Sequence, residues 1–272
     1  CGKTNTNGAK FDKSSMTVDW LGLCLKCRPI SKNDAYKTEA LSHDISYCEI
    51  KRMMFNNGWH YYVVLYLKGD APKKFIKTGS NEMGIDPGVS TIAGVSDDKA
   101  VLKELAPKSK DYDKQIRKLQ QKMDTSKRIS NPNKYNQDGT ISKSNRDRWV
   151  YSNTYKKNGR QLKCVYRKKS AYTKQSHEEL ANELLEDSII FLVEDMNYAA
   201  LGKKSKKPAE RQDKTTNVKQ KDGTTKAVKK YKKKRRYGKS LNNRSPSLFL
   251  SILKRKCGLY GGQVQTVKTK TF

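Results

Sequence analysis

The alternation of apolar and polar residues along the chain changes character near residue 80. Before it, residues 47–54 and 59–67 are two runs that favour strands, and the second is rich in aromatic and β-branched residues that would lie on both faces of its strand. An Asn-Asn-Gly stretch separates the two runs, and Asn-Gly is a strong signal for a hairpin turn. With a further strand expected over residues 18–23, the pattern predicts a β-rich domain over residues 1–80.

From residue 81 onward, short apolar runs alternate with helical patterns, which is typical of a mixed α/β domain. Strands are expected over residues 83–86, 91–96, 100–105, 189–193 and 263–268. One helix is expected where apolar side chains recur every three or four residues, at Tyr112, Ile116, Leu119 and Met123. Helical periodicity returns over residues 162–185, and a last helix begins with Ser245 as N-cap and Pro246 at its first position.

Residues 201–240 interrupt this domain with the most biased composition of the chain. The segment holds 17 Lys and Arg against three Asp and Glu, a net charge of +14, and it has almost no apolar residues. Such a segment buries too little apolar surface to offset the conformational entropy that folding removes. We therefore predict a basic insertion that is mobile until it binds a partner.

The charge of the whole chain indicates the kind of partner. Its 272 residues carry 58 Lys and Arg against 27 Asp and Glu, a formal net charge of +31, which favours a polyanion. Nucleic acid is favoured over a membrane, because no apolar run approaches about 18 residues and no basic amphipathic anchor is found. Six scattered cysteines without secretory features predict reduced thiols in a cytoplasmic protein, nucleoid-associated if its source is prokaryotic.

Two acidic residues stand at the carboxyl ends of expected strands. Asp86 lies within Gly-Ile-Asp-Pro-Gly, and Glu194 follows the apolar run 189–193. In open α/β sheets, ligands bind at the carboxyl ends of the strands. Two carboxylates held together repel each other unless a proton or a cation lies between them, and Mg²⁺ is the simplest such cation at neutral pH. The pair predicts a Mg²⁺ site suited to phosphodiester cleavage, whereas Asp195 should face the other side of its strand and be structural.

A family resemblance rests on three parts of the sequence: Gly-Ile-Asp-Pro-Gly around Asp86, Val-Glu-Asp-Met-Asn around Glu194, and the helix and strand over residues 245–268. They resemble the first two RuvC motifs and the following segment of TnpB, the transposon-encoded RNA-guided nucleases related to type V CRISPR effectors. The resemblance covers residues 45–272. It implies an RNase H-like (RuvC) mixed sheet over residues 81–272, preceded by the later part of a β-barrel wedge domain.

The resemblance also implies chemistry and partners. Asp86 would bridge two Mg²⁺ ions and Glu194 would hold one of them, while guide RNA and target DNA would be the bound nucleic acids. The family's third acidic residue, usually near paired Cys-x-x-Cys zinc ligands, would follow Phe272. We therefore expect a piece truncated at both ends, which begins with Cys1 rather than Met, and which does not cleave nucleic acid alone.

Two other functions fit the same pattern. A cleavage-inactive RNA- or DNA-binding regulator derived from such an enzyme would keep the fold, although the presence of both carboxylates argues against it. An unguided transposase or junction resolvase would share the RNase H-like fold and the metal chemistry, but it needs neither a wedge-like β region nor a bound RNA. RNA that copurifies with the protein would separate guided from unguided functions.

The candidate nucleic-acid contacts are the basic residues Lys229, Lys230, Lys232, Lys233, Lys234, Arg235, Arg236 and Arg244. These cations could neutralise phosphates while the tyrosines between them stack on unpaired bases, although a solvated loop would have the same composition. Cys24 and Cys27 have the spacing of half a zinc site, but no second pair follows, so free thiols are expected. For His60 and His177 we expect packing or surface exposure rather than catalysis.

Overall fold

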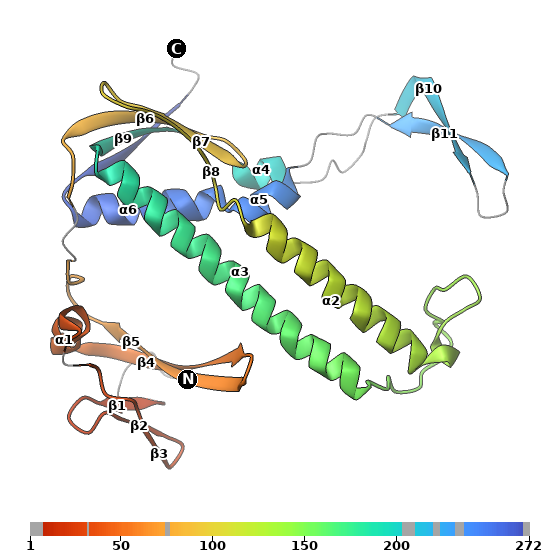
Figure 1. Ribbon diagram of the computed structural model, residues 1–272, viewed down its shortest axis with the longest axis horizontal. Helices are drawn as coiled ribbons and strands as arrows, with labels where there is room; N and C mark the ends of the chain where they lie inside the picture. The colour runs from red at the N-terminus through yellow and green to blue at the C-terminus, as the bar shows by residue number, and fades with distance from the viewer. Residues whose placement is uncertain are drawn as a thin grey trace. The chain divides into compact units, whose positions relative to one another are not determined.

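The computed structural model describes residues 8–31, 33–73, 77–202, 210–219, 224–231 and 237–268. Contacts between Cα atoms divide the chain into two compact units (Figure 1). The first comprises Cys1–Lys77 and Lys108–Tyr172, and the second comprises Thr78–Pro107 and Thr173–Phe272. Residues 108–172, which the sequence pattern placed in the nuclease domain, therefore group with the N-terminal residues.

The first unit begins with a small antiparallel sheet. Its strands are β1 (Lys10–Asp12), β2 (Thr17–Trp20) and β3 (Leu23–Lys26), which pair in sequence order. The strand β2 overlaps the stretch where the sequence predicts one. A short helix, α1 (Ala35–Ser42), follows the sheet, and Asp34 caps it by accepting a hydrogen bond from a backbone N–H.

A long antiparallel hairpin completes the β structure of this unit. It consists of β4 (Ile45–Phe55) and β5 (Gly58–Leu67), which confirms both predicted strands and the predicted turn. Phe11, Val18 and Cys48 are buried together and join the hairpin to the small sheet. The β-rich character predicted for the N-terminal residues is thus present, with a core of modest size.

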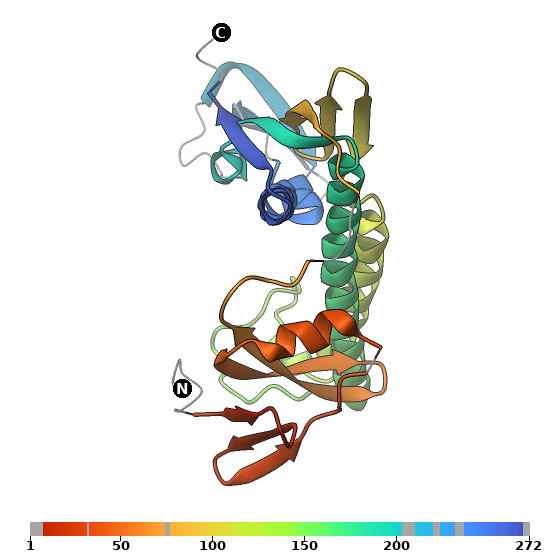
Figure 2. The same cartoon turned by 90° about the vertical axis from the view of Figure 1, so that its left-hand side faces the viewer.

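The rest of the first unit is helical. It contains α2 (Ser109–Ile129), a 3-10 turn η1 (Pro132–Lys134) and the first half of α3 (Asn153–Leu185). In both views α2 and this half of α3 run side by side (Figures 1 and 2), and an ion pair of 2.7 Å joins Lys169 to Asp113. Within the described residues, no helix is both long enough and apolar enough to span a bilayer.

The helix α3 contacts the β4–β5 hairpin directly. Cys164 Sγ lies 3.6 Å from the carbonyl oxygen of Met54, and Arg167 Nε donates a hydrogen bond of 3.2 Å to the same oxygen. The Arg167 guanidinium also lies 3.8 Å from the centre of the Phe55 ring, a cation–π geometry. These contacts explain why the helix pair groups with the N-terminal strands.

The second unit is built on a five-stranded mixed sheet with the order β12-β9-β6-β7-β8. The strands are β6 (Asn81–Pro87), β7 (Thr91–Val95), β8 (Ala100–Glu104), β9 (Ser188–Glu194) and β12 (Gln263–Val267). β6, β7 and β8 form an antiparallel meander, whereas β9 and β12 run parallel to β6. The five strands and the mixed α/β class agree with the sequence prediction.

One face of this sheet carries the larger core of the protein. Its buried strand residues include Met83, Ile85, Phe191 and Val193. They pack with Leu180, Ala181, Leu184 and Leu185 of α3 and with Phe249, Ile252, Leu253 and Cys257 of α6 (Pro246–Leu259). Pro246 begins α6 as predicted, but Ser245 makes no side-chain cap and instead adopts a left-handed conformation with φ of 47°.

Between β9 and α6 the chain forms two short helices and a further hairpin. These are α4 (Tyr198–Gly202), β10 (Glu210–Lys219), β11 (Thr225–Tyr231) and α5 (Gly238–Arg244), with β10 antiparallel to β11 and α4 in contact with α5. The sequence did not predict these two strands, because they lie in the polar insertion. The mobility expected of the insertion stays a prediction.

Candidate functional site

The two predicted carboxylates project from the face of the sheet opposite the core. In β6, Asp86 lies between the buried residues Ile85 and Pro87, and its own side chain is exposed. In β9, Glu194 follows the buried Val193 and is half-buried. Because successive strand residues point to opposite faces, burying one set against α3 and α6 directs the other set away from the core.

The strand register brings the two carboxylates together. β6 and β9 are parallel neighbours, with Ile85 opposite Val193. The next residues along the two strands are Asp86 and Glu194, which therefore lie side by side at the carboxyl end of the sheet. On the other side of β9, Glu194 is opposite Val267 of β12, so it belongs to a central strand. Residues that are far apart in the sequence thus converge as predicted.

Tyr198 is a third member of this site, and the sequence did not single it out. Its hydroxyl donates a hydrogen bond of 2.9 Å to the carbonyl oxygen of Pro87, the residue after Asp86. Burial, together with the negative charges of Asp86 and Glu194, raises the pKa of Tyr198 to about 12. Its position shortly after Glu194 was the only signal in the sequence.

The donor set fits a magnesium ion. Among the described residues, no group of three His, Cys, Asp or Glu side chains is placed to hold a metal. Mg²⁺ does not require one, because it keeps several waters and is usually bound through one or two carboxylates and substrate phosphates. Asp86 and Glu194 are carboxylates of this kind, on adjacent strands and on one face.

Arg244, a predicted nucleic-acid contact, has a different position in the structure. Its side chain is buried at 3% exposure and donates to the carbonyl oxygens of Leu105 and Ala106 and to the carboxylate of Glu104. A guanidinium enclosed by three acceptors of its own chain has no free face for a phosphate. The prediction for Arg244 is therefore corrected: this residue ties α5 to the end of β8.

His177 of α3 contacts the end of α5 at Arg244 and is completely buried. Its Nε2 lies 2.8 Å from the carbonyl oxygen of Arg244 and donates to it, while Nδ1 has no hydrogen-bond partner among the described residues. The ring meets Phe249 edge to face, with centroids 5.8 Å apart. Burial lowers the pKa of His177, because the charged imidazolium would lose its hydration. This histidine serves packing, which agrees with the sequence prediction.

A pH dependence of stability follows from His177. Its pKa in the folded protein lies below the 6.5 of an unfolded chain, so the unfolded state takes up the proton first as the pH falls. We expect the free energy of unfolding to decrease as the pH drops from about 7 through 6.5 and below. Urea unfolding at several pH values would measure this slope, and His177→Gln should flatten it. An equal slope in the variant would contradict the prediction.

The remaining predicted contacts belong to the basic insertion. Lys229 and Lys230 are in β11, where the structure describes the backbone. Lys232, Lys233, Lys234, Arg235 and Arg236 lie outside the described residues. Their assignment as nucleic-acid contacts stays a prediction.

The cysteines that the structure describes form no disulfide with one another. Cys24 is exposed, Cys27 is partly buried, and Cys48, Cys164 and Cys257 are buried without a disulfide. Burial raises the pKa of Cys27, which disfavours the thiolate that a metal would require. Among the described residues these cysteines form no zinc site.

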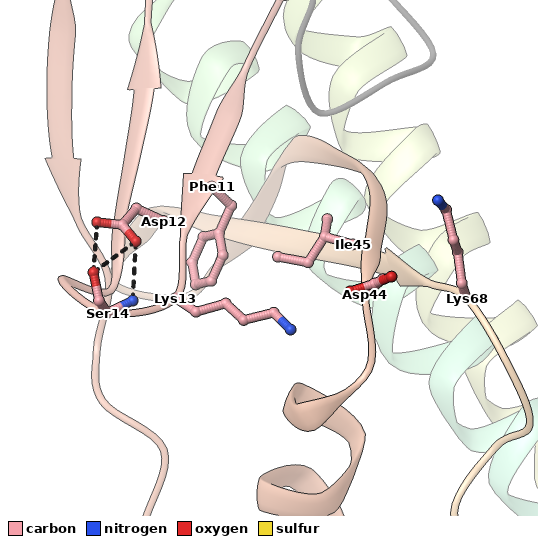
Figure 3. A pocket seen from close by; sticks show the side chains of 7 residues that line it. All are labelled: Phe11, Asp12, Lys13, Ser14, Asp44, Ile45 and Lys68. Atoms are coloured by element: carbon pink, nitrogen blue, oxygen red, sulfur yellow. Dashed lines mark hydrogen bonds between the residues drawn. The ribbon is translucent and has the colours of Figure 1, made fainter.

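A pocket of about 460 Å³ lies in the first unit (Figure 3). It is lined by Phe11, Asp12, Lys13, Ser14, Asp44, Ile45 and Lys68. Hydrogen bonds from Ser15 and Ser14 lower the pKa of Asp12 to about 2, so its charge is already satisfied within the turn. None of the predicted site residues lines this pocket.

Comparisons with known proteins complete this description. No protein-family model matches the chain, and no curated protein matches it. A cryo-EM structure of the Cas12f1-sgRNA-target DNA complex matches with 13% identity and a TM-score of 0.45, over 89% of this chain and 39% of that chain. A cryo-EM structure of a CRISPR-Cas12f ternary complex matches with 15% identity and a TM-score of 0.32, over 89% of this chain and 40% of that chain. The chain thus spans about two fifths of the length of these solved proteins.

Proposed function

We propose that the chain is part of an RNA-guided DNA endonuclease of the TnpB kind, with a RuvC-like, Mg²⁺-dependent site at Asp86 and Glu194. The observation that carries this proposal is the placement of these carboxylates on adjacent parallel strands, on one face, at the carboxyl end of the sheet. The motifs in which the two residues lie resemble the first two RuvC motifs, and this resemblance supplies the expectation of a guide.

The proposed chemistry divides between the ion and the chain. When bound, Mg²⁺ would lower the pKa of a water and stabilise the leaving oxygen of the scissile phosphodiester. Asp86 and Glu194 would supply oxygen ligands from two strands whose other face is buried in the core. The hydrogen bond from Tyr198 to Pro87 fixes the turn that follows Asp86.

We propose that the protein binds nucleic acid mainly through its positive charge, by contacts to phosphates and not to base edges. The net charge of +31 suits the backbones of a guide RNA and its target DNA. In guided nucleases, base pairing by the guide selects the sequence while the protein binds the shape and backbone of the duplex. The chain needs few base-specific contacts for that task.

The test is a cleavage assay on the longer protein, preceded by sequencing of the RNA that copurifies with it. A guided nuclease retains a defined RNA and cuts DNA complementary to the guide part of that RNA, with Mg²⁺ and not with EDTA. A protein that cuts without RNA would be the unguided alternative. A protein that binds a defined RNA and never cuts would be the regulator.

A further prediction concerns the basic run of the insertion. Replacing Lys232, Lys233, Lys234, Arg235 and Arg236 with Ser should weaken binding of RNA or DNA and flatten its dependence on salt. Each phosphate that the variant no longer neutralises should lower the logarithmic slope by up to roughly one unit, because fewer counterions are released. Binding measured at several salt concentrations checks this.

A charge-matched control distinguishes an effect of the basic run itself from an effect of lowering the net charge of the protein. Replacing the exposed Lys10, Lys26, Arg28, Lys73 and Lys77 with Ser removes the same charge from the first unit. We expect a smaller change of slope in this control. Equal slopes in the wild type and the insertion variant would contradict the prediction, and a large drop in melting temperature would show that the run is packed structure.

A further inference from the structure

Tyr198 ties together the two strands that carry the carboxylates. It follows β9 in the chain, and its hydroxyl donates to the carbonyl oxygen of Pro87, the last residue of β6, at 2.9 Å. The ladder between these strands ends at the pair Ile85 and Val193, just before the carboxylates. The phenol therefore connects β6 to the chain after β9 beyond the point where backbone pairing ends.

A hydrogen bond and the packing of α4 hold Tyr198 in place. Asn197 precedes it and accepts a hydrogen bond of 2.9 Å from the backbone N–H of Ala200, which is the N-cap interaction for α4. The helix α4 rests against α5, where the Leu241 side chain lies close to Gly202. Tyr198 is the first residue of α4, so the cap and the packing together direct its ring toward the end of β6.

We propose that Tyr198 is a positioning residue for the metal site, setting the spacing of Asp86 and Glu194 through its hydrogen bond to Pro87. This inference rests on the proposed function, because it assigns a task to the same site. Two ionised carboxylates on neighbouring strand ends repel each other. The pairing of β6 with β9 stops at Ile85 and Val193, one residue before Asp86 and Glu194. The hydrogen bond from Tyr198 to Pro87 keeps the two strand ends from moving apart in the metal-free protein. The two carboxylates therefore have to move less when a cation binds.

The substitution Tyr198→Phe tests this role with the loss of a single oxygen atom. The ring and its packing remain, while the bond to Pro87 is removed. We expect the affinity of the 272-residue chain for Mn²⁺, followed by electron paramagnetic resonance, to fall about two- to tenfold, the range that the loss of one neutral hydrogen bond gives. In the metal-free variant, amide hydrogen exchange should quicken around Asp86 and Glu194 but not at Phe191 in the core.

Two controls make the result interpretable. Asp86→Asn removes a ligand and should abolish binding at this site. Tyr66→Phe removes a phenol hydrogen bond in the first unit, where Tyr66 lies 3.3 Å from the Glu49 carboxylate, and should leave Mn²⁺ affinity unchanged. The Asp86 control reports on the proposed site, and the Tyr198 variant reports on the inference.

The outcomes separate the two claims. If Asp86→Asn abolishes Mn²⁺ binding and Tyr198→Phe binds like the wild type, the positioning role is wrong and the proposed site stands. The same conclusion holds if Tyr198→Phe lowers only the melting temperature, since the tyrosine then merely holds α4. If Asp86→Asn binds Mn²⁺ as tightly as the wild type, the site assignment and the positioning role both fall.

Discussion

Substitution of Asp86 or Glu194 by Ala in the longer protein is expected to abolish Mg²⁺-dependent DNA cleavage and to leave nucleic-acid binding nearly unchanged. Each change removes a proposed metal ligand and none of the predicted phosphate contacts. Residues that only orient a metal ligand typically change activity or metal affinity by about 10- to 100-fold, so losing a ligand itself should exceed that range.

Cleavage of labelled DNA over a range of Mg²⁺ concentrations, with binding measured in parallel, checks this expectation. Glu82→Ala is the matched control, because Glu82 is an exposed carboxylate on the same strand and the same face, but toward the amino end. It should cut like the wild type. Wild-type cleavage by the Asp86 or the Glu194 variant would remove the site assignment, and equal losses in all three variants would indicate a general effect of charge.

The strands could be predicted from local pattern, and the convergence of the carboxylates from the place of each at the carboxyl end of its strand. In β6, Met83 and Ile85 alternate with polar or small residues, which identifies a strand with one buried face. The run that ends at Glu194 is apolar throughout, as a central parallel strand requires. Because ligands bind at the carboxyl ends of strands in such sheets, both acidic residues are expected at the same edge of one sheet. The parallel register of β6 and β9 agrees with that expectation.

Other features depend on long-range contacts that no local pattern reveals. Arg244 follows a run of cations, and an arginine in such a run is expected at the surface. In the structure it is buried and donates hydrogen bonds to the Leu105 carbonyl oxygen and the Glu104 carboxylate at the end of β8. Tyr198 lies in a helix of five residues, too short to show a periodicity. The first half of α3 meets the N-terminal strands where Cys164 and Arg167 contact Met54, and α2 is joined to α3 by the ion pair of Asp113 with Lys169. Only the folded chain brings these residues together.

Arg244→Met should lower the free energy of unfolding by about 3 kcal/mol, the scale of leaving buried polar groups without partners. The guanidinium donates to the carbonyl oxygens of Leu105 and Ala106, and Ala106 is fully buried with a φ of 41°, a left-handed conformation that a non-glycine residue adopts at a cost. Methionine is long and apolar enough to occupy the space but donates nothing to these oxygens. The turn after β8 would then lose the bonds that hold its strained conformation.

Urea unfolding at neutral pH measures this loss, and Arg255→Met is the matched control. Arg255 is also an arginine of the second unit, but its side chain is 56% exposed and its ion pair with Glu178, at 2.8 Å, is a surface pair worth less than about 1 kcal/mol. Nucleic-acid binding by folded Arg244→Met should keep the salt slope of the wild type, because a buried guanidinium neutralises no phosphate. A variant as stable as the Arg255 control but with a flatter salt slope would return Arg244 to the nucleic-acid interface and refute its structural role.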